Sequence, residues 1–329
     1  MKVIIPLAGL GTRLRPHTYS KPKSMVNVAG KPVLGHILDQ LVDIKVEEII
    51  FITGYLGQQI EDYVKKTYPQ FSVRYLEQQE MLGQAHAIQM AKEFIDGEVL
   101  IIFGDTISEA DYTQLETLPS DGVLYVREVE DPARFGVIEL DAQSYITRLV
   151  EKPQSYVSNL AVIGVYFFKD GGWLMRSIDK LIADKKMLGG EFYLADAIQG
   201  MLEEGAKLNA VTVDVWEDCG KIDALLQTNR YLLAKNHDQT SYDFPDSIII
   251  PPVFIGPGVT VSRSIIGPNV SLAEGAKISD SIVRDSMINE KAQVTNSTVT
   301  ASVIGSNALV NGTFHRLNVG DNSQVDLSD

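Results

Sequence analysis

Short apolar runs alternate with helical patterns up to about residue 235. The runs are rich in Val, Ile, Phe and Tyr and are short enough to be strands buried in a sheet. They lie at residues 2–7, 48–53, 71–76, 98–103, 122–126, 161–168 and 209–215. Helical stripes are formed by Val33, Leu34, Ile37, Leu38, Leu41 and Val42, and by Leu194, Ile198, Met201 and Leu202, with Gly205 placed to cap the second helix. The alternation predicts an α/β domain with a mostly parallel sheet.

A different pattern begins after the polar segment AKNHDQTSYDFPD. Aliphatic residues recur five or six positions apart from Ile255 to Val310, and SIII at 247, SIIG at 264 and SIVR at 281 repeat every 17 residues. Turn-forming residues are frequent, charged residues are few, and there is no helical stripe. Such a hexapeptide-like repeat predicts a parallel β-helix, with one residue of each short strand in a stacked core. The alternative, an antiparallel β-sandwich, predicts less uniform spacing.

The composition narrows the class of protein. The chain has 329 residues, a formal net charge of -14 and one cysteine, Cys219. The acidic balance argues against a nucleic-acid partner, because binding to a phosphate backbone requires a broad basic surface. No apolar run approaches the length of a membrane span or forms a secretory leader, so we expect no membrane partner. A lone cysteine fits a reducing compartment, and we expect a cytoplasmic protein.

The cations are concentrated near the start of the chain. Lys2, Arg13, Arg15, Lys21, Lys23 and Lys31 all precede the first acidic residue, Asp39. Two glycines in GLGTRLRP follow the first apolar run, where exposed backbone amides can cradle phosphate. The dinucleotide fingerprint fails, because leucine stands at its third glycine position, and no P-loop motif is present. This segment indicates a bound polyanion without identifying it.

The stretch LAGLGTRLRPHTYSKPKSMVNVAGKPVL resembles the signature of the sugar-1-phosphate nucleotidylyltransferases, L-A-x-G-x-G-T-R-L-x-P-x-T followed by P-K and V-x-G-K-P. The glycine stretch departs from that pattern by one residue. The resemblance implies a Rossmann-like nucleotidyltransferase domain, in which Arg13 holds the triphosphate and Lys23 sits at the α-phosphate. It also implies nucleotide contacts from Leu7, Gly9, Gly11 and Thr12. Lys21 is a weaker candidate, and Arg15 stays open between a solvated and an effector-facing residue.

Two further stretches resemble the nucleotide and metal segments of this family. YLEQQEMLGQAHAI resembles the base-binding segment, and its spacing selects Gln78 and Gly83; a glutamine amide can pair with thymine or uracil. His86 is interpreted as a residue of the first turn of a helix. VLIIFGDTI and VWEDCGK resemble the segments that supply two aspartates, which implies Mg2+ bound by Asp105 and Asp218.

Other stretches resemble the sugar half of the family's site. ARFGVIELD contributes Gly136, whose backbone would contact sugar hydroxyls. LVEKP implies that Glu151 accepts hydrogen bonds from hydroxyls and that Lys152 binds the sugar phosphate. SNLAVIGVYFF contributes Asn159 and Gly164, and GGEFYLADAI contributes Glu191, although Asn159 and Glu191 could instead support a loop.

The resemblance therefore predicts a Mg2+-dependent enzyme that joins a nucleoside triphosphate, dTTP or UTP, to a sugar-1-phosphate, with glucose-1-phosphate favoured. Two alternatives stay open: a mannose-1-phosphate guanylyltransferase, and a catalytically silent subunit that senses nucleotide sugars. We expect a catalytic domain at 1–236 and a left-handed parallel β-helix at 245–329. Because the repeats contain no histidine, we interpret the β-helix as a structural or assembly element of a homo-oligomer.

Overall fold

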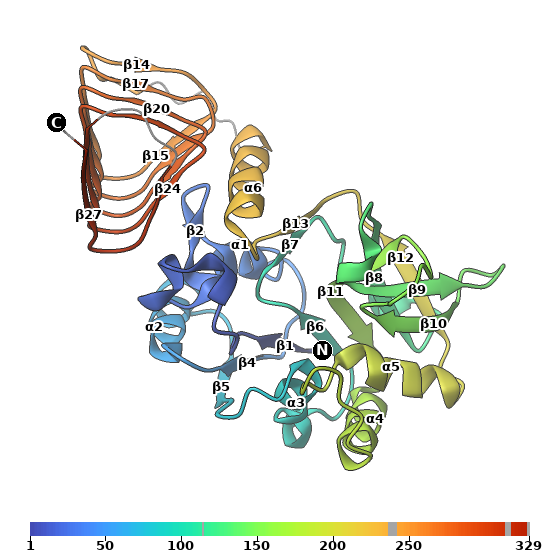
Figure 1. Ribbon diagram of the computed structural model, residues 1–329. Helices are drawn as coiled ribbons and strands as arrows, with labels where there is room; N and C mark the ends of the chain where they lie inside the picture. The colour runs from blue at the N-terminus through green and yellow to red at the C-terminus, as the bar shows by residue number, and fades with distance from the viewer. Residues whose placement is uncertain (114, 236–241, 313–316, 328–329) are drawn as a thin grey trace. The chain divides into compact units, whose positions relative to one another are not determined.

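The computed structural model describes residues 1–113, 115–235, 242–312 and 317–327 (Figure 1). Its contacts group these residues into two compact units, and each unit combines separated stretches of the chain. The first unit contains Met1–Leu10 and Ile37–Trp216, and the second contains Gly11–His36 and Glu217–Asp329. The basic segment, defined here as residues 11–36, therefore groups with the C-terminal part of the chain. The functional boundary between 236 and 245 stays a prediction.

Nine strands of the first unit form one sheet with the path β10-β9-β11-β6-β1-β4-β5, and β8 and β12 extend it beside β11. The strands are β1 (Lys2–Pro6), β4 (Glu48–Thr53), β5 (Val73–Glu77), β6 (Val99–Ile102), β8 (Gly122–Glu128), β9 (Gly136–Leu140), β10 (Ile146–Glu151), β11 (Leu160–Phe168) and β12 (Leu208–Thr212). Strands β6, β1, β4 and β5 are parallel, whereas β11 runs antiparallel to β6, β8 and β9. The predicted α/β fold is confirmed, with the antiparallel β9–β10 pair as an addition.

The helices of the first unit cover the sheet with their apolar stripes. They are α2 (Gly57–Thr67), α3 (Gln84–Gln89), α4 (Gly171–Ala183) and α5 (Leu194–Glu203), and α1 (Val33–Asp39) leads into this unit. Ile88, Leu174 and Ile198 share a core with the sheet residues Ile4 and Ile101. The predicted cap of α5 is present, because Gly205 follows that helix with φ +99. Helix α1 is shorter than its predicted stripe and leaves Val42 exposed.

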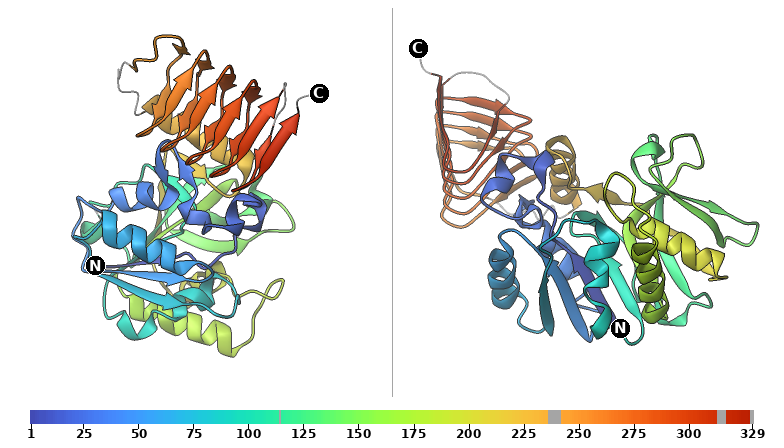
Figure 2. Two further views of the ribbon diagram at one scale, coloured as in Figure 1. Left: turned by 90° about the vertical axis from the view of Figure 1, so that its left-hand side faces the viewer. Right: turned by 60° about the horizontal axis from the view of Figure 1, so that its bottom comes forward.

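In the second unit the described strands from β14 to β27 form three parallel sheets, and from β14 to β25 successive strands along the chain belong to successive sheets (Figure 2). One sheet contains β14 (Ile248–Ile249), β17 (Ile265–Ile266), β20 (Ile282–Arg284) and β23 (Thr298–Thr300). The next contains β15 (Val253–Ile255), β18 (Val270–Leu272), β21 (Met287–Ile288), β24 (Val303–Ile304) and β26 (Asn318–Val319). The third contains β16 (Thr260–Ser262), β19 (Lys277–Ser279), β22 (Gln293–Thr295), β25 (Leu309–Gly312) and β27 (Gln324–Leu327). This is the expected arrangement of a left-handed parallel β-helix, and the parallel pairing rejects the antiparallel sandwich.

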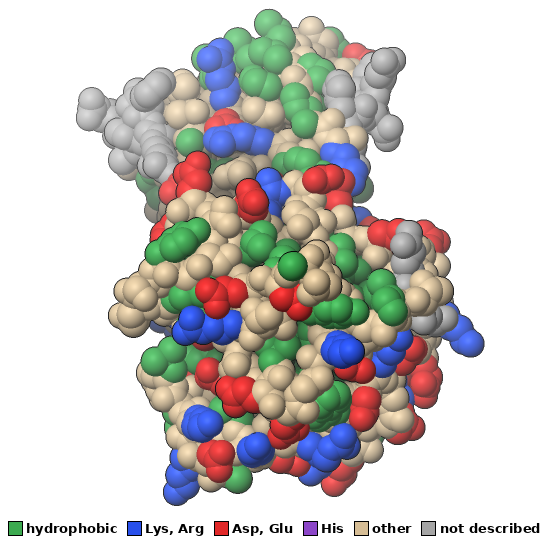
Figure 3. All heavy atoms as spheres, turned by 90° about the vertical axis from the view of Figure 1, so that its right-hand side faces the viewer, with side chains coloured by type: hydrophobic (Ala, Val, Ile, Leu, Met, Phe, Trp, Pro, Cys, Tyr) green, Lys and Arg blue, Asp and Glu red, His purple; other side chains and the backbone are tan. Residues whose placement is uncertain are grey.

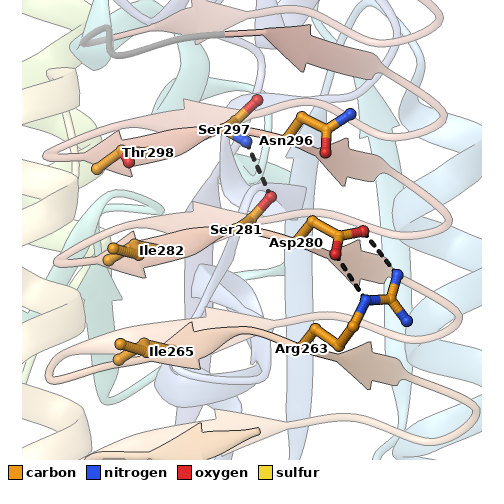
Figure 4. A pocket seen from close by; sticks show the side chains of 8 residues that line it. All are labelled: Arg263, Ile265, Asp280, Ser281, Ile282, Asn296, Ser297 and Thr298. Atoms are coloured by element: carbon orange, nitrogen blue, oxygen red, sulfur yellow. Dashed lines mark hydrogen bonds and ion pairs between the residues drawn. The ribbon is translucent and has the colours of Figure 1, made fainter. Parts of the chain in front are cut away.

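The sequence repeat has two physical causes in these coils. The recurring aliphatic residues, such as Ile266, Val283 and Val299, are stacked in register and buried. The recurring serines connect one coil to the next, because the Oγ of Ser281 donates to Ser279 O and accepts from Ser297 N, at 2.6 and 3.1 Å (Figure 4). Each serine therefore satisfies backbone groups at a corner, where the strand ladder is interrupted.

Short elements make up the basic segment. They are three 3-10 turns, η1 (Thr12–Leu14), η2 (His17–Tyr19) and η3 (Lys23–Met25), followed by the hairpin of β2 (Asn27–Val28) and β3 (Lys31–Pro32). Strand β13 (Trp216–Asp218) and helix α6 (Ile222–Lys235) precede the β-helix, and β7 (Thr106–Ser108) follows β6.

Within the described ranges, no helix has both the length and the apolar character that crossing a membrane requires. Acidic and basic side chains are interspersed over the face shown in Figure 3.

Candidate active site

The carboxyl ends of β1 and β6 bring Leu7 and Asp105 into the same part of the first unit. The two strands are parallel neighbours, and Leu7 is buried directly after β1. Gly104 lies against it, since a Cβ added there would be 2.1 Å from Leu7 Cδ2. Asp105 follows as a half-buried carboxylate, and Gly9 leaves open space beside its backbone. Ligands bind at such carboxyl ends in α/β sheets.

Gly164 supports the same strand end from β11. Its φ is +85, and a Cβ at this position would lie 2.9 Å from the ring of Phe103. The backbone of Gly164 also accepts a hydrogen bond from Phe103 N at 2.9 Å, two residues before Asp105. Gly164 is therefore required for close packing beneath the Asp105 loop. Asn159 is half-buried ahead of β11, and its carbonyl accepts a hydrogen bond from Val129 N at 2.9 Å.

Gln78 is buried at the end of β5 and is oriented by two neighbours. Its Nε2 donates to Gly83 O at 3.4 Å and lies 3.0 Å from His86 Nδ1. An amide nitrogen can only donate, so His86 Nδ1 is the acceptor and a neutral His86 carries its proton on Nε2. Sequence reasoning treated His86 as a helix residue; it lies in α3 and also orients Gln78. The QxxxxGxA spacing pointed to the amide but not to this partner.

Gly83 joins the segment predicted to bind the base to the segment predicted to bind the sugar. Its φ is +98, and a Cβ would lie 2.6 Å from Phe192 O and 2.9 Å from Glu191 Cβ. Backbone hydrogen bonds reinforce this approach, from Ala85 N to Phe192 O at 3.0 Å and from Phe192 N to Leu82 O at 2.8 Å. Glu191 is exposed beside Gly83. The first unit therefore brings together two stretches that the sequence assigned separately.

Gly136, Glu151 and Lys152 are brought together by the β9–β10 pair. Gly136 is opposite Glu151 in register, and a Cβ at Gly136 would be 3.0 Å from Glu151 Oε2. Burial raises the pKa of Glu151 to about 7, against the lowering effect of Lys152, and Asp196 and Glu191 add to the rise. The carboxyl group thus titrates near neutral pH, and its ionised form is the one that only accepts hydrogen bonds.

Lys152 is held by a phenol and by the neighbouring carboxylate. Its Nζ donates to Tyr193 OH at 2.7 Å and lies 3.7 Å from Glu151 Oε1. Burial favours a lower pKa for this amine, but Tyr193 and Glu151 raise it, so the cation is kept. Tyr193 and Asp196 are residues that sequence reasoning missed. Burial raises the pKa of Asp196. Both stand in GGEFYLADAI within five positions after Glu191. The available signal was that they are polar residues at the start of an otherwise apolar helix.

The second unit contains the other predicted residues. Gly11 has φ +62, and a Cβ there would lie 3.0 Å from Lys23 Cβ, so the glycine turn packs directly on Lys23. Thr12 and Arg13 are exposed in and around η1. Arg13 and Asp218 converge beside Gly220, where a Cβ would be 3.1 Å from Arg13 Nη2 and 2.6 Å from Asp218 Oδ1. An arginine, a carboxylate and the lysine-bearing turn are thus collected in one unit.

Two residues that the sequence left open have structural explanations. Arg15 is exposed, and its guanidinium stacks over the ring of Tyr19 at 4.9 Å from the centroid. Lys21 Nζ lies 3.5 Å from Glu290 Oε2 in the β-helix. The side chain of Cys219 is buried, with Sγ 3.7 Å from Thr228 Oγ1.

Each of the two predicted metal ligands, Asp105 and Asp218, is a carboxylate, a ligand type that hard cations accept. Asp105 and Asp218 are both half-buried at strand ends, one in each unit. Across the part of the chain that the structure describes, no group of three or more His, Cys, Asp or Glu side chains forms a candidate metal site. Carboxylates supplemented by phosphate oxygens and water are a usual donor set for Mg2+. The metal assignment therefore stays a prediction.

Glu151 gives a testable pH dependence of stability. The pKa of Glu151 is about 7 in the folded state, against about 4.3 in the unfolded chain. Between these two pH values the folded state keeps the carboxyl protonated, whereas the unfolded chain ionises it. The stabilising contribution of this carboxyl is present at low pH and is lost as pH rises toward 7. Relative to Glu151→Gln, the wild-type unfolding free energy should fall by up to about 3 kcal/mol over this window.

Urea unfolding of both proteins at several pH values between about 4.5 and 8 measures this difference. Glu139→Gln removes a carboxyl on the neighbouring strand β9, half-buried and 3.7 Å from Arg148 Nη1; it is the matched control and should show no such divergence. Parallel pH curves for wild type and Glu151→Gln would contradict the assignment.

Comparison with known proteins shows which family this chain is similar to. Residues 2–235 match the nucleotidyl transferase family. The chain is 37% identical over 255 residues to the bifunctional protein GlmU of Methanocaldococcus jannaschii, covering 76% of this chain and 59% of that protein. It spans about 60% of the length of such archaeal GlmU relatives. It is 28% identical, over 99% of both chains, to the glucose-1-phosphate thymidylyltransferase of Streptomyces antibioticus.

A solved structure supports the fold of most of the chain. The crystal structure of a UDP-glucose pyrophosphorylase complexed with UDP-glucose aligns with a TM-score of 0.64 at 23% identity, over 71% of this chain and 99% of that one. The likeness at this identity concerns the fold. With the family match over residues 2–235, these findings confirm the resemblance seen in the sequence: the chain belongs to the nucleotidyl transferase family.

Proposed function

We propose that this protein transfers a nucleotidyl group from dTTP or UTP to a sugar-1-phosphate, with glucose-1-phosphate as the favoured acceptor, and releases pyrophosphate. The observation that carries the proposal is the pairing of Leu82–Ala85 with Glu191–Phe192 in the first unit. It brings a candidate base reader next to candidate sugar contacts, which is what formation of a nucleotide sugar requires. The name of the Streptomyces antibioticus relative, glucose-1-phosphate thymidylyltransferase, supports the substrate class.

In the proposed reaction, a phosphate oxygen of the sugar-1-phosphate attacks the α-phosphorus of the triphosphate. The new P–O bond forms as the bond to the β-phosphate oxygen breaks, and pyrophosphate takes the leaving electron pair. Lys152 would hold the attacking phosphate, Lys23 the α-phosphate, and Arg13 the leaving group. Catalysis then consists of alignment and charge neutralisation, since the step needs little covalent chemistry from the protein.

Asp105 and Asp218 are the residues that would hold Mg2+. When bound, the metal would supply charge neutralisation at phosphate oxygens. Leu7, Gly9, Gly11 and Thr12 would contact the nucleotide through a turn that offers backbone amides. Glu151, Gly136, Asn159, Gly164 and Glu191 would form the sugar side.

The hydrogen bonds around Gln78 favour a base with an N–H at the reading position. Both amide hydrogens are directed at protein acceptors, Gly83 O and His86 Nδ1. The carbonyl Oε1 is then the group that Gln78 offers to a base, and it can accept from N3–H of thymine or uracil.

The cellular setting stays a proposal as well. We propose a cytoplasmic homo-oligomer without nucleic-acid or membrane partners, in which 1–236 is catalytic and 245–329 forms a separate β-helix domain. Size-exclusion chromatography with light scattering tests the oligomeric state.

Release of pyrophosphate, measured over a grid of nucleoside triphosphates and sugar-1-phosphates with and without Mg2+, tests the function. We expect the highest kcat/KM for dTTP or UTP with glucose-1-phosphate, and loss of turnover when Mg2+ is chelated. Faster turnover of GTP with mannose-1-phosphate would favour a guanylyltransferase. No turnover with any pair would favour the silent, sensing subunit.

A further inference from the structure

The basic segment lies along one side of the β-helix, inside the second unit. Its residues contact the coils in reverse order, so that the end of the segment meets the first coil and its beginning meets the last. The contacts are Gly30 with Phe254, Ala29 with Asn229 and through it Ser271, Asn27 with Glu290, Lys21 with Ser306, His17 with Asn318, and Ser20 with Asp321. The segment that contains Lys23 is therefore supported by residues 200 to 301 positions away in the chain.

Glu290 is the polar centre of this contact. Its Oε2 lies 3.5 Å from Lys21 Nζ and accepts a hydrogen bond from Ser306 Oγ, while its Oε1 accepts one from Asn27 Nδ2. Lys21 also donates to Ser306 Oγ at 3.2 Å, which closes the network. One carboxylate thus holds a residue on each side of η3.

The two charged side chains of this network are partly shielded from solvent. The side chain of Lys21 is 16% exposed and that of Glu290 is 34% exposed. Burial favours a higher pKa for Glu290, but Lys21 and Ser306 lower it below its usual range, so the carboxyl is ionised at neutral pH. A networked and partly buried ion pair of this kind orders its partners more than an isolated surface pair does.

Lys23 lies between the two residues that Glu290 holds. It begins η3, and Gly11 packs against its Cβ at 3.0 Å from the position that a Cβ on Gly11 would take. Releasing Lys21 and Asn27 would free the backbone on both sides of Lys23. A displacement of a catalytic group by about 1 Å can cost about 100-fold in rate.

We propose that Glu290 is a positioning residue for nucleotidyl transfer: it holds η3 from the β-helix and so fixes where the Lys23 amine points. The inference rests on the proposed function, because that function gives Lys23 its role. It adds a part in the active-site scaffold to the assembly role that the sequence suggested for the β-helix. It also explains part of the excess of cations before Asp39, because the charge of Lys21 is paired with the carboxylate of Glu290 and not with a substrate.

The test compares Glu290→Gln and Lys21→Met, singly and together, in the full-length protein. The control is Asp285→Asn, which weakens the ion pair of Asp285, directly after β20, with Arg230 of helix α6; neither residue is among the contacts with the basic segment named above. We expect kcat to fall at least 10-fold in each single variant, with a much smaller change in KM for the sugar-1-phosphate. The double variant should be no slower than the slower single variant, because the two residues act through one contact.

Hydrogen exchange measured by mass spectrometry on peptides that cover residues 16–28 gives a readout that does not depend on turnover. These peptides should exchange faster in Glu290→Gln than in wild type, while Asp285→Asn leaves them unchanged. A wild-type kcat in Glu290→Gln, or an equal loss in Asp285→Asn, would overturn the proposal. If the wild-type protein turns over no substrate pair, the proposed function fails, and hydrogen exchange decides separately whether Glu290 holds the segment.

Discussion

Replacing Lys23 with alanine should lower kcat for nucleotidyl transfer by about 100-fold or more, because the α-phosphate would lose the cation that meets its developing charge. Folding should change little, since Lys23 is half-buried in a short turn and its contact with Gly11 involves the Cβ, which alanine keeps. Steady-state kinetics of pyrophosphate release, with the melting temperature measured in parallel, provide the check.

Lys66→Ala is the matched control for this change. Lys66 is an exposed lysine in the last turn of α2, and its replacement should leave kcat unaltered. Lys23→Arg keeps the charge but changes its geometry, and we expect an intermediate rate. A Lys23→Ala enzyme as fast as wild type would remove Lys23 from the mechanism, and with it the reason for a positioning role of Glu290.

Replacing Gly83 with alanine should destabilise the protein by about 2 kcal/mol or more and should also weaken nucleotide binding. The backbone at Gly83 has φ +98, and the new Cβ would lie 2.6 Å from Phe192 O and 2.8 Å from Phe192 N. These neighbours are backbone atoms, so relief requires the base and sugar segments to separate. Thermal unfolding should show a loss of several degrees in Tm.

Gly97→Ala tests whether the effect of Gly83→Ala is specific to this site. A Cβ at Gly97 would have no heavy atom within 4 Å, and its φ is not positive. Its Tm should stay close to that of wild type. Equal Tm values for Gly83→Ala and wild type would contradict the close approach of the two segments.

Much of the architecture was predictable because it depends on local patterns. Most strands between Lys2–Pro6 and Leu208–Thr212 follow from apolar runs. The β-helix follows from a repeat whose spacing predicts which residues pair between neighbouring coils. The β9–β10 pair was not predicted, since its alternation is short and partly polar. Its consequence is functional, because that pair places Gly136 opposite Glu151.

Motif spacing proposes the candidate residues, which stay predictions, and does not identify the side chains that fold against them. Motif spacing selected Gln78 and Lys152, because each stands in a recognisable stretch. Their partners, His86 and Tyr193, stand at positions where spacing alone does not distinguish a structural side chain from one that orients a ligand group. The raised pKa of Glu151 likewise depends on burial, which no local pattern encodes.

The sequence by itself determined the α/β class, the repeat and the concentration of cations before Asp39, because these are properties of neighbouring residues. Only the tertiary structure decided how those cations are used. Lys21 is taken up by Glu290 and Ser306, Arg15 stacks on Tyr19, and Arg13 converges with Asp218 beside Gly220. The physical reason is that a charge acts through the groups that folding brings within a few ångströms of it, and 285 residues of chain separate Lys21 from Ser306.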